Sequence, residues 1–321
     1  MPLLYENRRV VLDAIHITRF IYGDGSDEAA LSINGCPIYK KAFMGIYHAL
    51  KTCELYGIIS KPDDINEDFF GFYFAPMFNA TKRMNGDMTR AFGVFFANDP
   101  SGDMDYIYQL NAQRKELVAR EVNKILSSDQ PYAPYIYFTD ASSGVLGLLA
   151  TKLMNMTKMP TFVMNDEGDG TSGNRYHGSG RSPEWYSCME RFADTPVISV
   201  AGHPFAFGCG IENKTKLDKF FDFLQADIDK VIAETEIIEQ VPDFVINTDW
   251  SEDTGIDIEL FREYLDELES LHPFGKGFPA PFVKFVFNND DVVKWDTIGK
   301  AKQHLKISFP NGFDVLCWNQ A

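Results

Sequence analysis

The sequence predicts an α/β protein in which a long helix leads into an α/β domain and a small β-barrel of the OB type follows. Three observations predict this fold. Apolar residues recur with helical spacing from Met104 to Leu126, a strand–helix–strand pattern follows Pro131, and short β segments follow Pro242. The expected parts are a helical connecting region (1–130), the α/β domain (131–238) and the OB-like domain (239–321).

The first part is expected to be mainly helical. Apolar spacing indicates helices in the first ~60 residues, and an aromatic stretch, Phe69–Phe78, ends in Asn79–Arg83. In the long helix the apolar residues lie mostly three and four positions apart and charges occupy the other face. These apolar residues are Ile107, Leu110, Leu117, Val118, Val122 and Ile125.

The second part reads as a βαβ unit. Tyr135–Phe138 and Pro160–Met164 are short apolar strands, and the segment Ser142–Ala150 between them opens a helix. Such a unit of about 30 residues forms a parallel sheet. A glycine-rich loop is expected over 168–182, a strand over 197–200, and a closing amphipathic helix over 216–232.

The third part combines short strands with one helix. The helix is expected over 258–271, and this combination suits a small OB-type barrel. The strands are expected over 244–246, 282–287, 304–309 and 313–317.

Composition and charge exclude little. Hydrophobic residues make up 45% and charged residues 24% of the chain, which is ordinary for a globular protein. The net charge of −16 is concentrated in residues 227–269, where 15 acidic and two basic residues give −13 and leave −3 for the remainder. The acidity therefore argues neither for nor against a nucleic-acid partner.

The cysteines and the hydropathy indicate a compartment. Five widely spaced cysteines without a CxxC pair are typical of free thiols in a reducing environment. No apolar run approaches the ~18 residues of a membrane span. We therefore expect a cytoplasmic protein without a membrane partner.

Four segments could carry chemistry, and each also has a structural interpretation. Residues 177–182 (HGSGRS) have a phosphate-binding composition, because glycines let the backbone approach an anion and arginine adds two donors; an ordinary flexible loop is the alternative. His203, between Gly202 and Pro204, could face a ligand at the carboxyl edge of a sheet or be bonded within a tight turn.

The other two segments are basic or aromatic. Asn79–Arg83 with Arg90 could follow a phosphate backbone or form a solvated surface turn. Residues 272–282 could stack bases or pack as a structural turn. No zinc pattern, P-loop, GxSxG, DxDG or DHH motif occurs, so the sequence predicts no metal site in this chain.

The order and spacing of these motifs resemble the RecJ branch of the DHH phosphoesterase family. The carriers are residues 72–83 (FYFAPMFNATKR), the helix through 110–116, 144–150 (GVLGLLA), 178–182 (GSGRS), Gly202-His203 and 272–282. The resemblance covers nearly the whole chain. It implies a DHH-associated α/β domain with a long connecting helix, followed by the OB-fold.

The resemblance also implies a function and site residues. The family hydrolyses phosphodiester bonds as a 5′→3′ single-stranded DNA exonuclease in repair, recombination and replication. Carried over, His203 would lie beside the scissile region. The residues expected to hold DNA phosphates are Asn79, Arg83, Ser179, Gly180, Arg181, Ser182 and Gly202.

The sequence departs from the family pattern at several points. The family's Asn-Ala-Ala-Gly-Arg becomes Asn79–Arg83 (NATKR), a usual histidine is Ser142, and a usual glycine is Ala201. A small insertion that includes Asn174 precedes the GSGRS segment. The chain begins where the family leaves its metal-binding domain, and it stops before the closing strand of the barrel.

Three functions are therefore expected in order. The first is a DNA-gripping subunit whose separately encoded DHH-domain partner binds Mn²⁺ or Mg²⁺, with no cofactor bound by this chain. The second is a non-catalytic single-stranded DNA-binding or regulatory module. The third is a phosphodiesterase for small oligonucleotides or cyclic dinucleotides.

Overall fold

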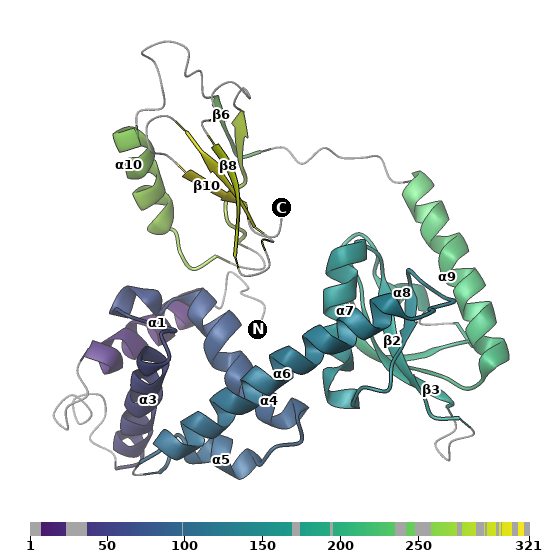
Figure 1. Cartoon of the computed structure of the whole chain (residues 1–321), viewed down its shortest axis with the longest axis horizontal. Helices are drawn as coiled ribbons and strands as arrows, with labels where there is room; N and C mark the ends of the chain where they lie inside the picture. The colour runs from purple at the N-terminus through teal and green to yellow at the C-terminus, as the bar shows by residue number, and fades with distance from the viewer. Residues whose placement is uncertain are drawn as a thin grey trace. The chain divides into compact units, whose positions relative to one another are not determined.

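The computed structural model describes residues 8–23, 37–97, 99–168, 174–192, 195–234, 242–247, 258–274, 278–286, 292, 294–299, 302, 304–309 and 314–317. The chain divides into two compact units, one of Ile15–Ile237 and one of Met1–Ala14 with Ile238–Ala321 (Figure 1). No helix in the described part of the chain is long and apolar enough to span a membrane.

The larger unit begins with helices around an aromatic core. They are α1 (Arg8–Gly23), α3 (Pro37–Leu55), the short η2 (Pro62–Asp64), the π-helix η3 (Phe69–Phe74), α4 (Ala75–Arg83), α5 (Met88–Gly93) and the long α6 (Ser101–Ser127). The aromatic stretch supplies this core, because Phe69 is buried and packs against Phe70 and Phe74. The predicted long helix is confirmed as α6.

A mixed five-stranded sheet follows α6. Its strands are β1 (Ile136–Phe138), β2 (Thr161–Asp166), β3 (Tyr176–Arg181), β4 (Ser199–His203) and β5 (Ala206–Ile211), in the order β1-β2-β3-β5-β4. The helices of this part are α7 (Ser143–Thr157), α8 (Cys188–Phe192) and α9 (Lys214–Glu234). Strands β1 and β2 are parallel, as the βαβ pattern predicts, and the other pairings are antiparallel.

Alternation along the strands separates two cores. Tyr137 and Val163 point to the face where they pack with residues of α6 and α7. Ile136 and Phe162 point to the opposite face, where they pack with residues of α9. This period of two is the geometry of a strand buried on both sides.

The expected glycine-rich loop is wrong for residues 176–181, which form β3 in the interior of the sheet. The glycines serve close packing rather than a mobile turn. A Cβ on Gly178 would lie 2.3 Å from the carbonyl oxygen of Val163, and a Cβ on Gly180 would lie 2.3 Å from the Phe207 ring. A strand can hold glycine where a neighbour approaches this closely.

The smaller unit contains helix α10 (Ile258–Glu269) and two sheets among its described residues. Strand β6 (Phe244–Asn247) pairs parallel with β7 (Val283–Val286). Strands β8 (Lys294–Ile298), β9 (His304–Ser308) and β10 (Asp314–Cys317) form an antiparallel sheet. The described residues do not close into a barrel. Strand β8 was missed by the sequence prediction, because Lys294 and Asp296 interrupt its apolar character.

Candidate nucleic-acid interface

Three arginines from distant segments converge at the first turns of α7. Arg83 ends α4, Arg114 lies within α6, and Arg181 ends β3. Arg83 Nη1 donates a hydrogen bond to the carbonyl oxygen of Gly144 at 3.3 Å, and the Arg181 guanidinium packs over Gly147. We call Arg83, Arg114 and Arg181 the arginine cluster.

The cluster is close enough for its members to repel one another. Burial is the main cause that lowers the pKa of Arg114 and of Arg181, and the positive charge of Arg83 lowers both pKa values further. Both effects disfavour the charged guanidinium. A bound anion would relieve this repulsion.

The glycines of α7 make the approach possible. A Cβ on Gly144 would lie 2.3 Å from the backbone oxygen of Arg83, and one on Gly147 would lie 2.5 Å from Arg181 Nη2. No acidic residue occupies the first turn of α7. The N–H groups at a helix N-terminus favour an anion, so the helix adds to the positive potential of the cluster.

The cluster has no carboxylate partner in the described part of the chain. The other arginines whose side chains are described each pair with an acidic residue: Arg19 with Asp63, Arg90 with Asp103, Arg120 with Glu121, Arg175 with Asp166, and Arg191 with Asp227. Partly buried charges are normally paired. Three guanidiniums that lack a carboxylate among the described residues therefore mark a site for an external anion.

Arg114 is held in place by a neighbour on the same helix. Its Nε and Nη2 both donate to Asn111 Oδ1, at 3.0 and 2.9 Å, and Asn111 is buried. The sequence prediction missed Arg114 as a site residue. The available signal was the spacing of Asn111 and Arg114, which places them one turn apart on one helix face.

Arg181 also belongs to a shallow trough on the sheet. Strand register places three rows on one face: His177, Gly210 and Ser199; Ser179, Gly208 and Ala201; Arg181, Ala206 and His203. The residues of β5 form a small-residue floor, and β3 and β4 form walls about 10 Å apart, twice the strand spacing. Gly208 is exposed, and a Cβ on it would meet nothing closer than 3.8 Å.

The far end of the trough forms a pocket of about 200 Å³. It is lined by Asn174, His177, Ser199, Val200, Ala201, Gly208, Cys209 and Gly210. The trough thus runs from polar side chains at one end to Arg181 and His203 at the other. Its width and small-residue floor suit an extended polar chain.

The predicted site residues are distributed unequally over this geometry. Arg83 and Arg181 belong to the arginine cluster, and Ser179 lies in the trough wall. Asn79 is exposed on α4, one turn before Arg83. Arg90, considered with them, is instead bonded to Asp103 at 2.7 Å.

Two predicted residues lie away from the trough. Gly180 faces the opposite side of the sheet against Phe207, and its strand pairs on both edges with β2 and β5. Ser182 is buried and donates its hydroxyl to the carbonyl oxygen of Tyr186. We therefore leave both out of the proposed anion site.

His203 and Gly202 lie at the end of an edge strand. The sequence prediction placed His203 at the carboxyl edge of a sheet after an apolar strand, but β4 is antiparallel and His203 begins the hairpin to β5. Its side chain is exposed and shares a row with Arg181. Gly202 has a φ of +145°, which favours glycine.

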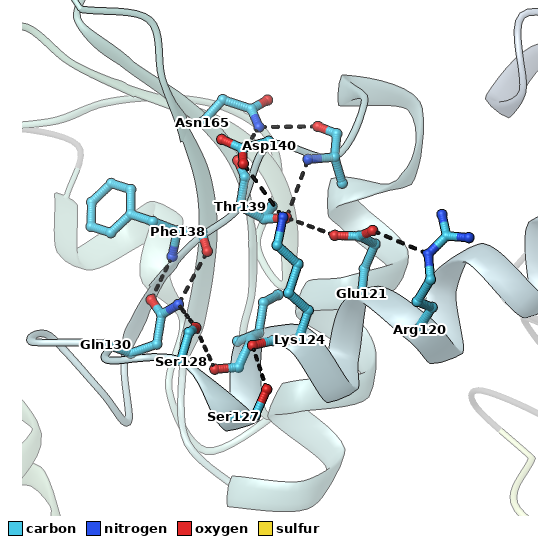
Figure 2. Close-up of polar contacts among 12 residues, drawn as sticks. Arg120, Glu121, Lys124, Ser127, Ser128, Gln130, Phe138, Thr139, Asp140 and Asn165 are labelled. Carbon is cyan, nitrogen blue, oxygen red and sulfur yellow. Dashed lines mark hydrogen bonds and ion pairs between the residues drawn. The ribbon is translucent and has the colours of Figure 1, made fainter.

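A polar network fixes the loop that presents the N-terminus of α7 (Figure 2). Asn165 Nδ2 donates to the carbonyl oxygens of Thr139 and Ala141 at 2.5 and 3.0 Å. Thr139 Oγ1 donates to the buried Glu121 carboxylate at 3.3 Å, and Lys124 pairs with Asp140. The network ties α6 to the ends of β1 and β2 and so holds the arginine-bearing helix beside α7.

The aromatic turn and the metal-ligating residue types add nothing to this site. Of the 272–282 segment, 275–277 lie outside the described residues, and Phe274 stacks on Phe278 at 5.6 Å between ring centroids. No group of three or more His, Cys, Asp or Glu side chains that could hold a metal ion occurs among the described residues. The described donors therefore do not fit a catalytic metal pair.

Comparisons with known proteins agree with this architecture. The DHHA1 domain family matches residues 131–230, and the RecJ OB domain family matches residues 254–321. The single-stranded-DNA-specific exonuclease RecJ of Haemophilus influenzae is 26% identical over 258 residues, which are 74% of this chain and 41% of that protein. The chain thus spans about two-fifths of the length of this relative.

Solved structures show the same fold. RecJ from Thermus thermophilus in complex with Mn²⁺ matches with a TM-score of 0.59 and 20% identity, over 88% of this chain and 41% of that chain. The Mg²⁺ complex of RecJ from the same organism matches with a TM-score of 0.58 and 21% identity, over 91% and 46%. This chain is therefore a RecJ-like polypeptide that corresponds to the C-terminal part of the family, with a DHHA1 domain followed by a RecJ OB domain.

Proposed function

We propose that this chain is the DNA-gripping portion of a RecJ-like 5′→3′ single-stranded DNA exonuclease that works in the cytoplasm in DNA repair, recombination or replication. A separate DHH-domain polypeptide supplies the Mn²⁺ or Mg²⁺ and the hydrolysis. The observation that carries the proposal is the arginine cluster, which lacks a carboxylate partner among the described residues.

The geometry supports a grip on a sugar–phosphate backbone. Guanidinium groups bind phosphates through paired, charge-assisted hydrogen bonds. The cluster would hold one phosphate at the N-terminus of α7, with Asn79 and Ser179 as further polar donors. The backbone would continue over the glycine floor of β5, and His203 would lie beside the scissile region. Contacts of this kind need no particular base sequence.

Two alternatives keep the same site. A non-catalytic single-stranded DNA-binding or regulatory module would use the arginine cluster equally well, because binding needs no metal. A phosphodiesterase for small oligonucleotides or cyclic dinucleotides would use the pocket at the far end of the trough. The OB domain match favours longer DNA over this last alternative.

The test is Mn²⁺-dependent digestion of a 5′-phosphorylated single strand by the purified chain, with and without a DHH-domain polypeptide. Activity only with that polypeptide is the expected result. Activity of the chain alone would contradict the division of labour. Salt-dependent binding without digestion in either mixture would favour the binding module, and digestion restricted to short oligonucleotides would favour the third function.

A further inference from the structure

An exposed tryptophan lies on a turn directly after the arginine-bearing strand. Strand β3 ends at Arg181, and the turn of residues 183–186 follows. The Trp185 side chain is 41% exposed although tryptophan is a large apolar residue. Nothing in the phosphate grip described above requires an aromatic ring at this position.

The turn that carries Trp185 is fixed at both ends. The Tyr186 N–H donates to the carbonyl oxygen of Pro183 at 3.0 Å, and the Ser182 N–H donates to the carbonyl oxygen of Phe205 at 3.1 Å. The Ser182 hydroxyl, which is buried, donates to the Tyr186 carbonyl oxygen. The backbone on either side of Trp185 is therefore held by hydrogen bonds to the sheet and within the turn.

The neighbouring side chain anchors the turn in the core. Tyr186 is fully buried and donates its hydroxyl to Asp227 at 2.7 Å, while the Arg191 guanidinium lies over its ring. The Trp185 ring packs edge-to-face on Tyr186 at 5.6 Å between centroids. An aromatic ring on a rigid support costs little conformational entropy when it binds a partner.

The position relative to Arg181 indicates what the ring meets. Trp185 lies four positions after Arg181 in the chain, so their Cα atoms lie within about 14 Å of each other. A nucleotide whose phosphate is bound at Arg181 has its base, or the base next to it, within reach of a ring at that distance. Single-strand binding proteins combine a basic groove with aromatic rings on which bases stack.

The geometry points to Trp185 as a nucleobase-stacking residue at the Arg181 end of the trough. This inference rests on the proposed single-strand binding. It adds a contact to the base, whereas the arginine cluster contacts the backbone. Tryptophan stacks on any base, so the contact would strengthen binding without introducing strong sequence preference.

The test separates base contacts from backbone contacts. Binding of a labelled oligothymidylate and of an equally long oligonucleotide with abasic sites is measured by fluorescence anisotropy for the wild-type chain and for W185A, W185F and E184Q. We expect W185A to bind oligothymidylate about tenfold more weakly, W185F to retain most of the affinity, and W185A to bind the abasic strand like wild type. E184Q is the matched control, because Glu184 is exposed on the same turn.

Each other outcome overturns a defined statement. An equal loss on both strands in W185A would mean that the substitution disturbs the phosphate grip. Unchanged affinity of W185A for both strands would leave the proposed function standing and assign the exposed ring to a protein partner instead. Failure of wild type to bind either strand would overturn the proposed function together with this inference.

Discussion

The most direct test of the arginine cluster is the substitution Arg114→Met. Methionine keeps an unbranched apolar side chain on α6 and removes the guanidinium that Asn111 holds in place. A hydrogen bond to a charged group contributes about 1.5–3 kcal/mol, so affinity for single-stranded DNA is expected to fall about 10- to 150-fold. Loss of one phosphate contact also makes the slope of log affinity against log salt shallower by about 0.7.

Stability should respond differently from binding. Burial and the charge of Arg83 already lower the pKa of Arg114 and disfavour its charged form, so its removal is expected to leave the free energy of unfolding unchanged or to raise it. The matched control is Arg120→Met, further along α6, where the arginine is exposed and pairs with Glu121. Both variants lose one positive charge from the same helix.

The assay is a fluorescence anisotropy titration at several salt concentrations, with thermal unfolding followed by circular dichroism. Arg114→Met should lose affinity and salt dependence, while Arg120→Met should stay close to wild type. Equal losses in the two variants would show that only long-range charge matters. A lower melting temperature with unchanged binding would show that Arg114 is structural, and either result would refute the assignment of the cluster.

Three further predictions follow from packing and ionisation. Gly180→Ala would place a Cβ 2.3 Å from the Phe207 ring and should lower the free energy of unfolding by about 1–3 kcal/mol in urea titrations; Gly208→Ala, in open space, should change it by less than about 0.5 kcal/mol. Arg175 donates two hydrogen bonds to Asp166 and lowers its carboxyl pKa. The pair therefore stabilises the fold above the unfolded pKa of about 3.9 and loses this effect as the pH falls through the lower folded value. Asp166→Asn should destabilise the chain at neutral pH by less than about 1 kcal/mol, because the pair is about 40% exposed, and the difference from wild type should vanish near pH 2 in unfolding titrations. Burial raises the pKa of three thiols to about 12, so mass spectrometry should find them unmodified by iodoacetamide at pH 8 in the folded chain and modified after denaturation; they are Cys53, Cys188 and Cys209.

Much of the fold could be predicted because its signals are local. Helical spacing in Met104–Leu126 identified α6, and the sequence of strand, helix and strand after Pro131 identified β1, α7 and β2. The β3 prediction failed for a non-local reason. Glycine and serine favour loops in isolation, but Gly178 and Gly180 are required by the approach of Val163 and Phe207 from other elements.

The candidate site could be predicted only in part. Arg83 and Arg181 were named through the motifs that contain them, and the structure brings both to the start of α7. Ser182 belongs to the same motif, yet its hydroxyl is buried against Tyr186. Adjacent residues in a strand point to opposite faces, so membership of a motif does not place every residue in a site.

The sequence by itself determined the order of the elements, the βαβ unit and the type of residue available to bind phosphate, because these depend on periodicity and on side-chain chemistry. Only the tertiary structure decided which of those residues act together. Arg83, Arg114 and Arg181 lie on α4, α6 and β3, and their meeting depends on two glycines of α7 and on the network around Thr139. The trough likewise exists only because β3, β5 and β4 align in register. Contacts between segments far apart in the chain are set by packing, which no local pattern encodes.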